Sequence, residues 1–334
     1  MEPGGNAGFL SFSAARSTHL LCSFLLSGSL SQEGKGGKAL NQIPLRHKWE
    51  PYLWLLPSIL LMGIFVVYPI GIVFKLSFSE ISRSGMVGGF NGLQNYITAV
   101  TAPEFGSVML NTLFWVVSVV GVSTLLGFIV AMVLNTKFRG RKIARSVVVF
   151  PWAATLVVQA SMWKYIINIE YGALNSTLLN LGIMSQSVNW RPTYIVDFIW
   201  ECGIGIFVTV PFVTFCVLAG LQSIDKSYYE AATVDGAGFW KKLRHLTLPL
   251  VRPSLTVSTV LNIIYVFNSF PIIYTITRGA PAHKTDTLVT YLYMLAFSEQ
   301  RKGPATALSV VGFAVLCVCA GVYMMVTMRK EDEE

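Results

Sequence analysis

Asp197 and Glu201 are the residues whose types and spacing come closest to proton chemistry in this sequence. Four positions apart on a helix, two carboxylates lie on the same face and can share or relay a proton. Ionisable groups within a membrane are functional by default, but this pair falls at the edge of an apolar run, where water stabilises both charges. We therefore predict that it does not form a catalytic site.

The common catalytic and metal-binding patterns are absent from the sequence. It contains no G-x-x-x-x-G-K-[S/T] phosphate loop, no G-x-S-x-G nucleophile turn and no H-E-x-x-H zinc motif. The glycine-rich stretch Gly34–Lys38 lacks the phosphate-loop spacing. The four histidines are scattered, and all the cysteines except Cys22 fall inside apolar runs. We predict that the chain is not an enzyme and that it binds no metal or cofactor itself.

A polar face on an otherwise apolar segment is the main candidate for ligand binding. Its members recur at i, i+3, i+6 and i+7, on one side of a helix: Asn262, Tyr265, Asn268 and Ser269. Such a face either bonds a neighbouring helix or lines a substrate path, and both alternatives fit. Amides and aromatic rings are the groups that a neutral sugar requires. Trp163 and Asn168 are further candidates for the path.

The polar segment that begins at Ser227 is predicted to form a short helix between two long apolar runs. Ser227 and Glu230 have the spacing of a capping box, in which each side chain bonds the other residue's backbone amide. Gly236 can adopt the left-handed conformation that ends a helix. The small side chains of Ala231 and Ala232 permit close approach of a partner. The alternatives are a docking helix and an interfacial helix lying on anionic lipid headgroups.

Six uncharged apolar runs must position these residues. Each reaches about the 18 residues that a membrane-spanning helix needs. The runs are Leu53–Phe74, Val108–Thr136, Ser146–Trp163, Cys202–Ile224, Pro253–Thr277 and Ala305–Met328. The chain is 53% hydrophobic and 13% charged, whereas a soluble chain is roughly 25% charged. We predict an all-α membrane protein with six transmembrane helices.

The positions of the basic residues predict how the chain is oriented. Most Lys and Arg residues precede the first run, lie between the second and third or the fourth and fifth, or follow the sixth. The positive-inside rule places these segments, and therefore both termini, in the cytoplasm. The net charge of +8 is then explained by topology, and we predict no nucleic-acid partner.

The remaining segments are assigned from length and composition. Residues 1–48 are predicted to be a flexible cytoplasmic extension; Leu20–Leu30 has the length of a signal-peptide core, but the basic residues around it favour an inside position. Residues 49–330 form the predicted transmembrane domain, with a cytoplasmic coupling loop at 223–250, and 331–334 form a tail. Thr287–Ser298 is too short to span and is predicted as an amphipathic or re-entrant segment on the outer face.

The segment around Glu230 resembles the EAA loop of binding-protein-dependent ABC importer permeases of type I. That motif reads E-A-A-x-x-x-G and then I-x-L-P; here it is Glu230-Ala231-Ala232 with Gly236, then Leu246-Thr247-Leu248-Pro249. The likeness covers about residues 50–330 and is most specific to the sugar branch, similar to maltose and glycerol-3-phosphate permeases. It is also carried by Phe150–Asn175, Ala219–Ile224, Asn268–Tyr274 and Thr290–Ala307. One departure is Thr277–Pro281, where the branch usually has two glycines before the proline. We expect Arg278 to alter this outer loop or its contact with a binding protein.

The resemblance implies a type I permease fold and a set of partners. The coupling loop would dock on a separate ATPase subunit through Ser227, Glu230, Ala231, Ala232, Asp235, Gly236, Ala237, Leu248 and Pro249. Two such subunits would use ATP and Mg, and a second permease subunit and an extracytoplasmic solute-binding protein would complete a carbohydrate importer in the lipid of the bacterial inner membrane. The alternatives are a glycerol-3-phosphate or related phosphodiester importer and an ion-coupled secondary transporter. The latter would need ionisable groups within the membrane, which the six runs lack.

Overall fold

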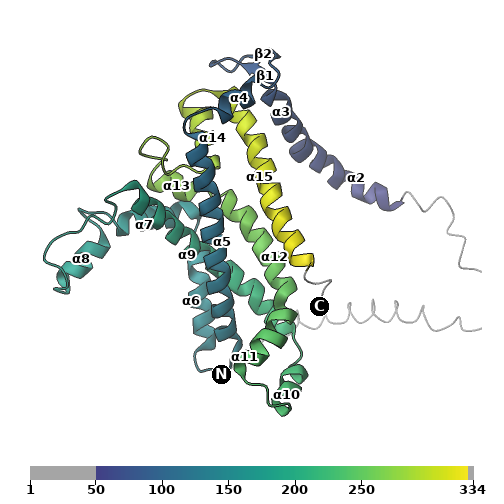
Figure 1. Cartoon of the computed structure of the whole chain (residues 1–334), viewed down its shortest axis with the longest axis vertical. Coiled ribbons are helices and arrows are strands. Elements are labelled where there is room, and N and C mark those ends of the chain that lie inside the picture. Colours follow the sequence, from purple (N-terminus) through teal and green to yellow (C-terminus); the bar gives the residue numbers. More distant parts are fainter. Residues whose placement is uncertain (1–49, 330–334) are drawn as a thin grey trace, which may run out of the picture. The chain divides into compact units, whose positions relative to one another are not determined.

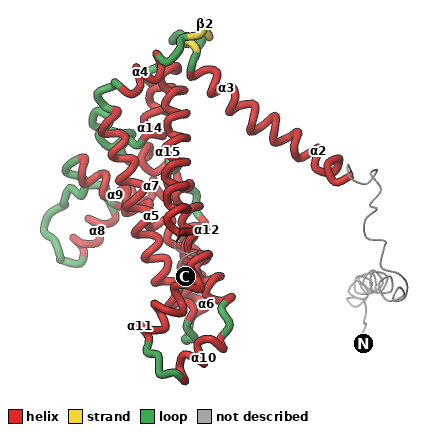
Figure 2. Tube along the Cα trace, turned by 45° about the vertical axis from the view of Figure 1, so that its right-hand side comes forward, coloured by secondary structure: helices red, strands yellow, loops and turns green. Residues whose placement is uncertain are grey.

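A computed structural model describes residues 50–329, most of which form helices joined by short loops (Figures 1 and 2). The predicted extension 1–48 and tail 331–334 lie outside the described residues. The chain divides into two compact units after Val67. The described part of the first unit consists of α2 (Glu50–Met62) and η2 (Gly63–Val67). The residues of this part from Tyr52 onward are exposed, apart from Gly63, which is half-buried.

The second unit begins with α3 and is a helical bundle with one small antiparallel hairpin. Its elements are α3 (Tyr68–Ser77), β1 (Ser79–Ile81), β2 (Val87–Phe90), α4 (Gln94–Val100), α5 (Phe105–Asn135), α6 (Arg141–Ala153), α7 (Leu156–Ile166), α8 (Ala173–Asn180), α9 (Tyr194–Ser223), α10 (Lys226–Val234), α11 (Phe239–Lys242), η3 (Leu243–Thr247), α12 (Leu248–Phe267), α13 (Phe270–Ile276), α14 (Leu288–Tyr293), η4 (Met294–Ser298) and α15 (Lys302–Arg329). The hairpin and α4 lie at one end of this unit, and α10 lies at the other (Figure 1).

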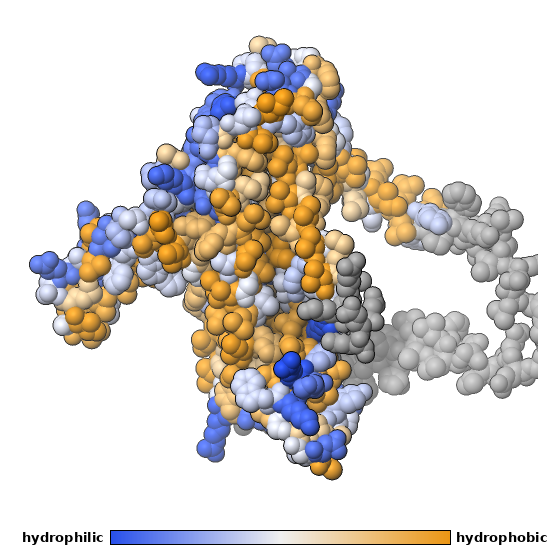
Figure 3. All heavy atoms as spheres, in the orientation of Figure 1, coloured by the Kyte–Doolittle hydropathy of each residue, from blue (hydrophilic) through white to orange (hydrophobic). Residues whose placement is uncertain are grey.

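Within residues 50–329, five helical stretches are long and apolar enough to cross a membrane, and the bent pair α6 and α7 brings the number to six. The five are Tyr52–Ser77, Phe105–Asn135, Tyr194–Ser223, Phe239–Ile276 and Lys302–Thr327. Hydrophobic side chains cover the middle of the bundle, and hydrophilic ones gather toward its two ends (Figure 3). This pattern agrees with the predicted all-α membrane protein of six spans.

The third span is not the straight helix that the sequence predicted over Ser146–Trp163. It consists of α6 and α7, which meet at an angle of 96°. Pro151 lacks the N–H that would bond the preceding turn, and Ala154 and Thr155 adopt extended backbone conformations. The Thr155 side chain then accepts a bond from the Val158 amide and begins α7 as a separate helix. The chain therefore changes direction within this span.

The predicted span Pro253–Thr277 is also broken. Helix α12 begins at Leu248, earlier than predicted, and ends at Phe267. Asn268 and Ser269 therefore lie between α12 and α13. Pro271, in the first turn of α13, has no N–H to continue the bonding pattern of α12. The four polar residues predicted on one helix face therefore do not share a continuous helix.

Helices α5, α9 and α12 form the centre of the bundle, and glycines let them approach closely. A Cβ on Gly127 of α5 would lie 2.7 Å from Cγ1 of Val213 on α9. A Cβ on Gly220 of α9 would overlap the Ser254 side chain on α12. Between apolar helices in lipid, such close contacts supply much of the attraction because no hydrophobic driving force favours association.

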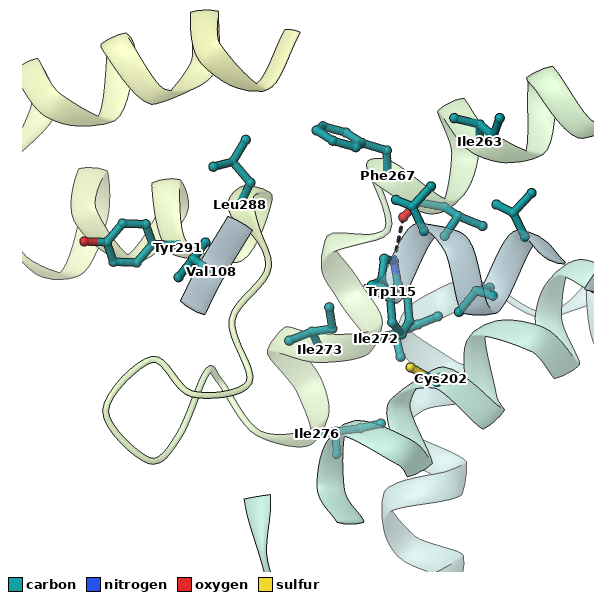
Figure 4. Close-up of a cluster of buried hydrophobic side chains, with 14 of the residues drawn as sticks. Val108, Trp115, Cys202, Ile263, Phe267, Ile272, Ile273, Ile276, Leu288 and Tyr291 are labelled. Atoms are coloured by element: carbon teal, nitrogen blue, oxygen red, sulfur yellow. Dashed lines mark hydrogen bonds between the residues drawn. The ribbon is translucent and has the colours of Figure 1, made fainter. Parts of the chain in front are cut away.

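A buried hydrophobic cluster joins these three helices to α13 and α14 (Figure 4). At its centre, Trp115 of α5 is 1% exposed, and its indole Nε1 donates to the carbonyl oxygen of Val266 at 2.9 Å. The indole ring covers Gly205, where a Cβ would lie 2.9 Å from the ring. This cluster fixes the end of α12 immediately before the break at Asn268.

The segment predicted as amphipathic or re-entrant, Thr287–Ser298, forms the short apolar helix of α14 and η4. Leu288, Tyr291 and Leu295 point into the core and are at most 2% exposed, whereas Phe297 is exposed. The helix begins with a reciprocal capping box between Thr287 and Thr290. One face of this helix thus packs inside the bundle.

Substitution of the contact glycine on α5 tests the importance of close packing. We expect Gly127→Ala to lower the free energy of unfolding by about 1–3 kcal/mol because the added methyl group overlaps Val213. Gly121→Ala on the same helix is the matched control, since nothing lies within 4 Å of a Cβ there. Thermal unfolding of both variants in detergent measures the difference, and equal melting temperatures would contradict the packing argument.

Candidate functional site

The helix predicted around Glu230 is present as α10, but Ser227 is not its N-cap. Asp225 occupies that position and accepts a hydrogen bond from the Ser227 amide at 2.9 Å. A carboxylate at an N-cap also interacts favourably with the positive end of the helix dipole, which explains why the helix begins at Asp225. Bonds from Ser227 lower the pKa of the exposed Asp225 carboxyl. The cap is therefore fully formed at neutral pH and is lost as the pH falls through that lowered pKa.

The C-terminus of α10 follows the prediction for Gly236. This residue has φ of +71°, and its amide bonds the Thr233 carbonyl at 3.0 Å. The Ala237 amide bonds the Ala232 carbonyl at 2.9 Å. These two bonds form a Schellman motif, which ends the helix and turns the chain toward α11.

The residues predicted to couple to an ATPase lie at the α10 end of the bundle, and none of them is buried. Exposed large apolar side chains accompany them: Tyr228, Val234, Phe239 and Trp240. Val234 is 89% exposed and Trp240 77%. Leu248 and Pro249 begin α12 and lie apart from α10 in sequence. Exposed apolar groups among polar ones are typical of a surface that binds another protein.

Side-chain bonds connect α10 to the base of the fifth span. The Tyr229 hydroxyl lies 3.1 Å from Oγ1 of Thr247 at the end of η3. Nζ of Lys242 donates to Oγ1 of Thr233 at 2.7 Å. These two contacts hold α10 against the segment that leads into α12. None of these four residues was among the predicted site residues. The partners lie 9 and 18 residues apart, and no local sequence pattern indicates a contact at those separations.

The predicted substrate-path residues differ in their surroundings. Asn262 is 0% exposed, and its Nδ2 donates to Oγ of Ser123 on α5 at 2.8 Å, so this residue makes the bond between helices that the sequence left as an alternative. Tyr265 and Asn268 are exposed, and Nδ2 of Asn268 bonds the Ile264 carbonyl. Ser269 is 5% exposed, and its hydroxyl has no partner among the described residues.

Trp163 and Asn168, the other path candidates, lie at the far end of α7 and just beyond it. The Trp163 ring packs edge-on against Phe207 at 5.5 Å and near Trp200 at 6.3 Å. Oδ1 of Asn168 accepts bonds from the amides of Glu170 and Tyr171 and shapes the turn after α7. The six path candidates therefore differ in burial and in the groups that they bond.

The carboxylate pair is not the hydrated interfacial pair that the sequence predicted. Asp197 is partly exposed and bonded to Arg191, but Glu201 is 0% exposed. Oε1 of Glu201 accepts a bond from the Thr277 hydroxyl at 2.7 Å, while its Oε2 has no partner among the described residues. The loop after α13 covers this part of α9, a long-range contact that no local sequence pattern indicates. The described residues contain no group of three His, Cys, Asp or Glu side chains suited to a metal ion.

Comparison with known proteins decides the family. Residues 123–328 match the family model of the binding-protein-dependent transport system inner membrane component. The chain belongs to this family of transport permeases. A probable ABC transporter permease protein of Brucella suis is 38% identical over 288 residues, which cover 86% of this chain and 100% of the relative. The trehalose/maltose transport system permease protein of Thermococcus litoralis is 33% identical over 84% of this chain and 94% of its own length.

A solved structure shares the fold of this permease. The crystal structure of a bacterial alginate ABC transporter, in complex with an alginate pentasaccharide-bound periplasmic protein, matches with a TM-score of 0.73 at 22% identity. The match covers 85% of this chain and 96% of that chain. The predicted type I permease fold is confirmed, and the protein is a multi-pass component of the inner membrane. Family membership favours the ABC importer over the ion-coupled alternative.

Replacement of Gly236 tests the geometry that ends α10. We expect Gly236→Ala to destabilise this end of the helix by about 1–2 kcal/mol, because a Cβ disfavours the left-handed backbone conformation. The measurement is hydrogen exchange of the Gly236 and Ala237 amides, which should become faster. Gly238→Ala is the matched control, since Gly238 has φ of −70° and nothing lies within 4 Å of a Cβ there. Unchanged exchange in Gly236→Ala would contradict the assignment.

Proposed function

We propose that this permease is one of two membrane subunits of an ATP-driven carbohydrate importer. The trehalose/maltose relative, which is matched over most of both chains, supports the substrate class. A solute-binding protein would deliver the substrate at the outer face, and ATP and Mg would be bound by two separate ATPase subunits. The chain itself carries no phosphate loop, which is consistent with that division of roles.

The observation that carries the coupling role is the construction of α10. It is a helix capped at both ends, exposed at the tip of the bundle, and bonded to the base of the fifth span. An isolated helix of this length is only marginally stable in water, so caps and tertiary bonds are needed to preserve its shape. We place this end in the cytoplasm, in accord with the basic residues around it. The residues from Ser227 to Ala237, together with Leu248 and Pro249, would form the ATPase contact.

The same construction provides a route for movement. A displacement of α10 caused by closure of the ATPase subunits would act on Thr247 through Tyr229 and on α11 through Lys242. Both segments lead into α12, which bonds α5 through Asn262. At its far end, α12 meets the break at Asn268 and Ser269, where Asn268 is exposed and the buried Ser269 hydroxyl has no partner among the described residues. The substrate path would pass this break, with Tyr265 exposed beside it.

Charge reversal at the centre of α10 tests this proposal in the assembled importer. We expect Glu230→Arg to reduce ATP-dependent carbohydrate uptake about tenfold or more, because a reversed charge in a protein contact costs roughly 2 kcal/mol. Glu170→Arg is the matched control, since Glu170 is exposed and lies on the turn before α8. Uptake by reconstituted vesicles and copurification of the ATPase subunits are the measurements. Normal uptake and copurification with Glu230→Arg would contradict the coupling role.

A further inference from the structure

An open cavity lies between α7 and α13, separated from α10 by the length of α12, and most of its lining residues are exposed. Its volume is about 350 Å³, and it is lined by Ser161, Lys164, Tyr165, Tyr171, Tyr274, Thr275 and Arg278. This volume is at the lower end of the range of small-molecule sites, roughly 300–1,000 Å³. The lining comes from two stretches that are distant in sequence, and α7 and α13 pack against each other. The 96° bend before α7 sets the direction in which this helix presents its residues.

The cavity carries two positive charges and no negative one. Neither Lys164 nor Arg278 forms an ion pair within residues 50–329, and none of the lining residues is Asp or Glu. Nζ of Lys164 donates to the Thr275 carbonyl oxygen at 2.7 Å, which holds the ammonium group at the wall between the two helices. Arg191 differs, because its charge is balanced by Asp197. The two cavity cations therefore keep their capacity to bind an anion.

Aromatic rings line the cavity beside these charges. Tyr165 and Tyr171 pack together with ring centroids 5.4 Å apart. Tyr274 stacks on Phe270 at 4.7 Å, and the Arg278 guanidinium carbon lies 5.8 Å from the Tyr274 ring centroid. Tyrosine offers a flat apolar face for the C–H groups of a sugar ring and a hydroxyl that bonds sugar hydroxyls. The cavity thus combines groups for a sugar ring with groups for an anion.

Arg278 adopts a backbone conformation that few residues other than glycine accept. Its φ is +55°, in the left-handed region. Its amide bonds the Ile273 carbonyl at 3.2 Å, and Gly279 follows with φ of +76°. Strained residues of this kind cluster at sites that bind ligands, where the required side chain offsets the backbone cost. A glycine would satisfy the backbone better, but it would supply no positive charge.

We propose that this cavity binds the anionic group of an acidic carbohydrate, such as a uronic acid, with the tyrosines packed on the sugar ring. The inference rests on the proposed role of the chain in carbohydrate import and specifies the substrate class further. It differs from the neutral sugar that the sequence favoured, because Lys164 and Arg278 are distant in sequence and only the fold brings them together. Charge-assisted bonds from an ammonium and a guanidinium group bind a carboxylate strongly and in a defined orientation.

The experiment compares two disaccharides of equal size that differ in one group. Cellobiuronic acid carries a carboxylate where cellobiose carries a hydroxymethyl group. Binding of each to the assembled importer in nanodiscs, without the solute-binding protein, is measured by titration at low salt. We expect the acid to bind about tenfold more tightly, which corresponds to one charge-assisted bond. This preference should decrease as the salt concentration rises.

Variants of Arg278 separate charge from folding. Arg278→Gly removes the charge and relieves the backbone conformation, so the variant should fold and lose most of the preference while it still binds cellobiose. Arg278→Lys retains the charge and should retain most of the preference. Arg83→Gln removes a charge from an exposed loop outside the cavity and is the matched control. Equal binding of the two disaccharides by the unaltered importer would overturn the proposal.

Two other results have defined meanings. If Arg278→Gly keeps the preference but weakens docking of the solute-binding protein, the charge serves a protein contact and the proposal is wrong. If the importer takes up neutral sugars with ATP but shows no preference for acids, the cavity assignment fails while the proposed function stands. Failure of ATP-dependent uptake with every carbohydrate tested would count against the proposed function itself.

Discussion

The close approach of α9 to α5 and α12 is the contact on which the other features depend. In lipid, apolar side chains gain little by leaving their surroundings, so helices associate through close packing and hydrogen bonds. Gly127 of α5 lets α5 approach α9 closely, and Gly220 of α9 does the same toward α12. Trp115 of α5 covers Gly205 of α9. The Asn262–Ser123 and Trp115–Val266 bonds add polar contacts between α5 and α12. This central bundle holds the bent and broken helices around it.

Breaks in spanning helices need such support because they leave backbone groups unpaired at membrane depth. The break at Asn268 follows directly after Phe267, which is buried in the central cluster (Figure 4). The amides of Asn268 and Ser269 remain bonded to the carbonyls of Ile264 and Val266. At the bend between α6 and α7, Thr155 caps the new helix and Nε2 of Gln159 bonds the Ala154 carbonyl. The protein can therefore change chain direction inside the membrane without losing these bonds.

Local sequence patterns predicted the features that depend on local chemistry. Apolar runs of sufficient length predicted the spans, and Gly236 predicted the end of α10. The start of α10 was misplaced because Asp225 and Ser227 are both suitable N-caps, and only the structure shows which side chain accepts the bond. The bend of the third span was not predicted, because a proline such as Pro151 kinks many membrane helices that continue to span. The extended conformation of Ala154 and Thr155 turned a kink into a bend of 96°.

Features that depend on distant contacts were not predictable in this way. Glu201 is buried and accepts a hydrogen bond from Thr277, which lies 76 positions away in the chain. The pairing of Lys164 with Arg278 in one cavity likewise requires α7 and α13 to be adjacent. A single sequence gives the chemical type of each of these residues but not their neighbours. The predicted polar face is interrupted at Asn268; Pro271 marks this region in the sequence, but the packing of Phe267 in the buried cluster is visible only in the structure.

The contact between Gly220 and Ser254 has a mechanical consequence. The chain enters α10 from the end of α9 and returns through α11 and η3 to the start of α12, and these two helices touch close to that end. A force on α10 is therefore applied to two helices that are already joined near the point of attachment. The contact between Gly220 and Ser254 would oppose separation of the two helices there, so a displacement of α10 would act on both helices at once.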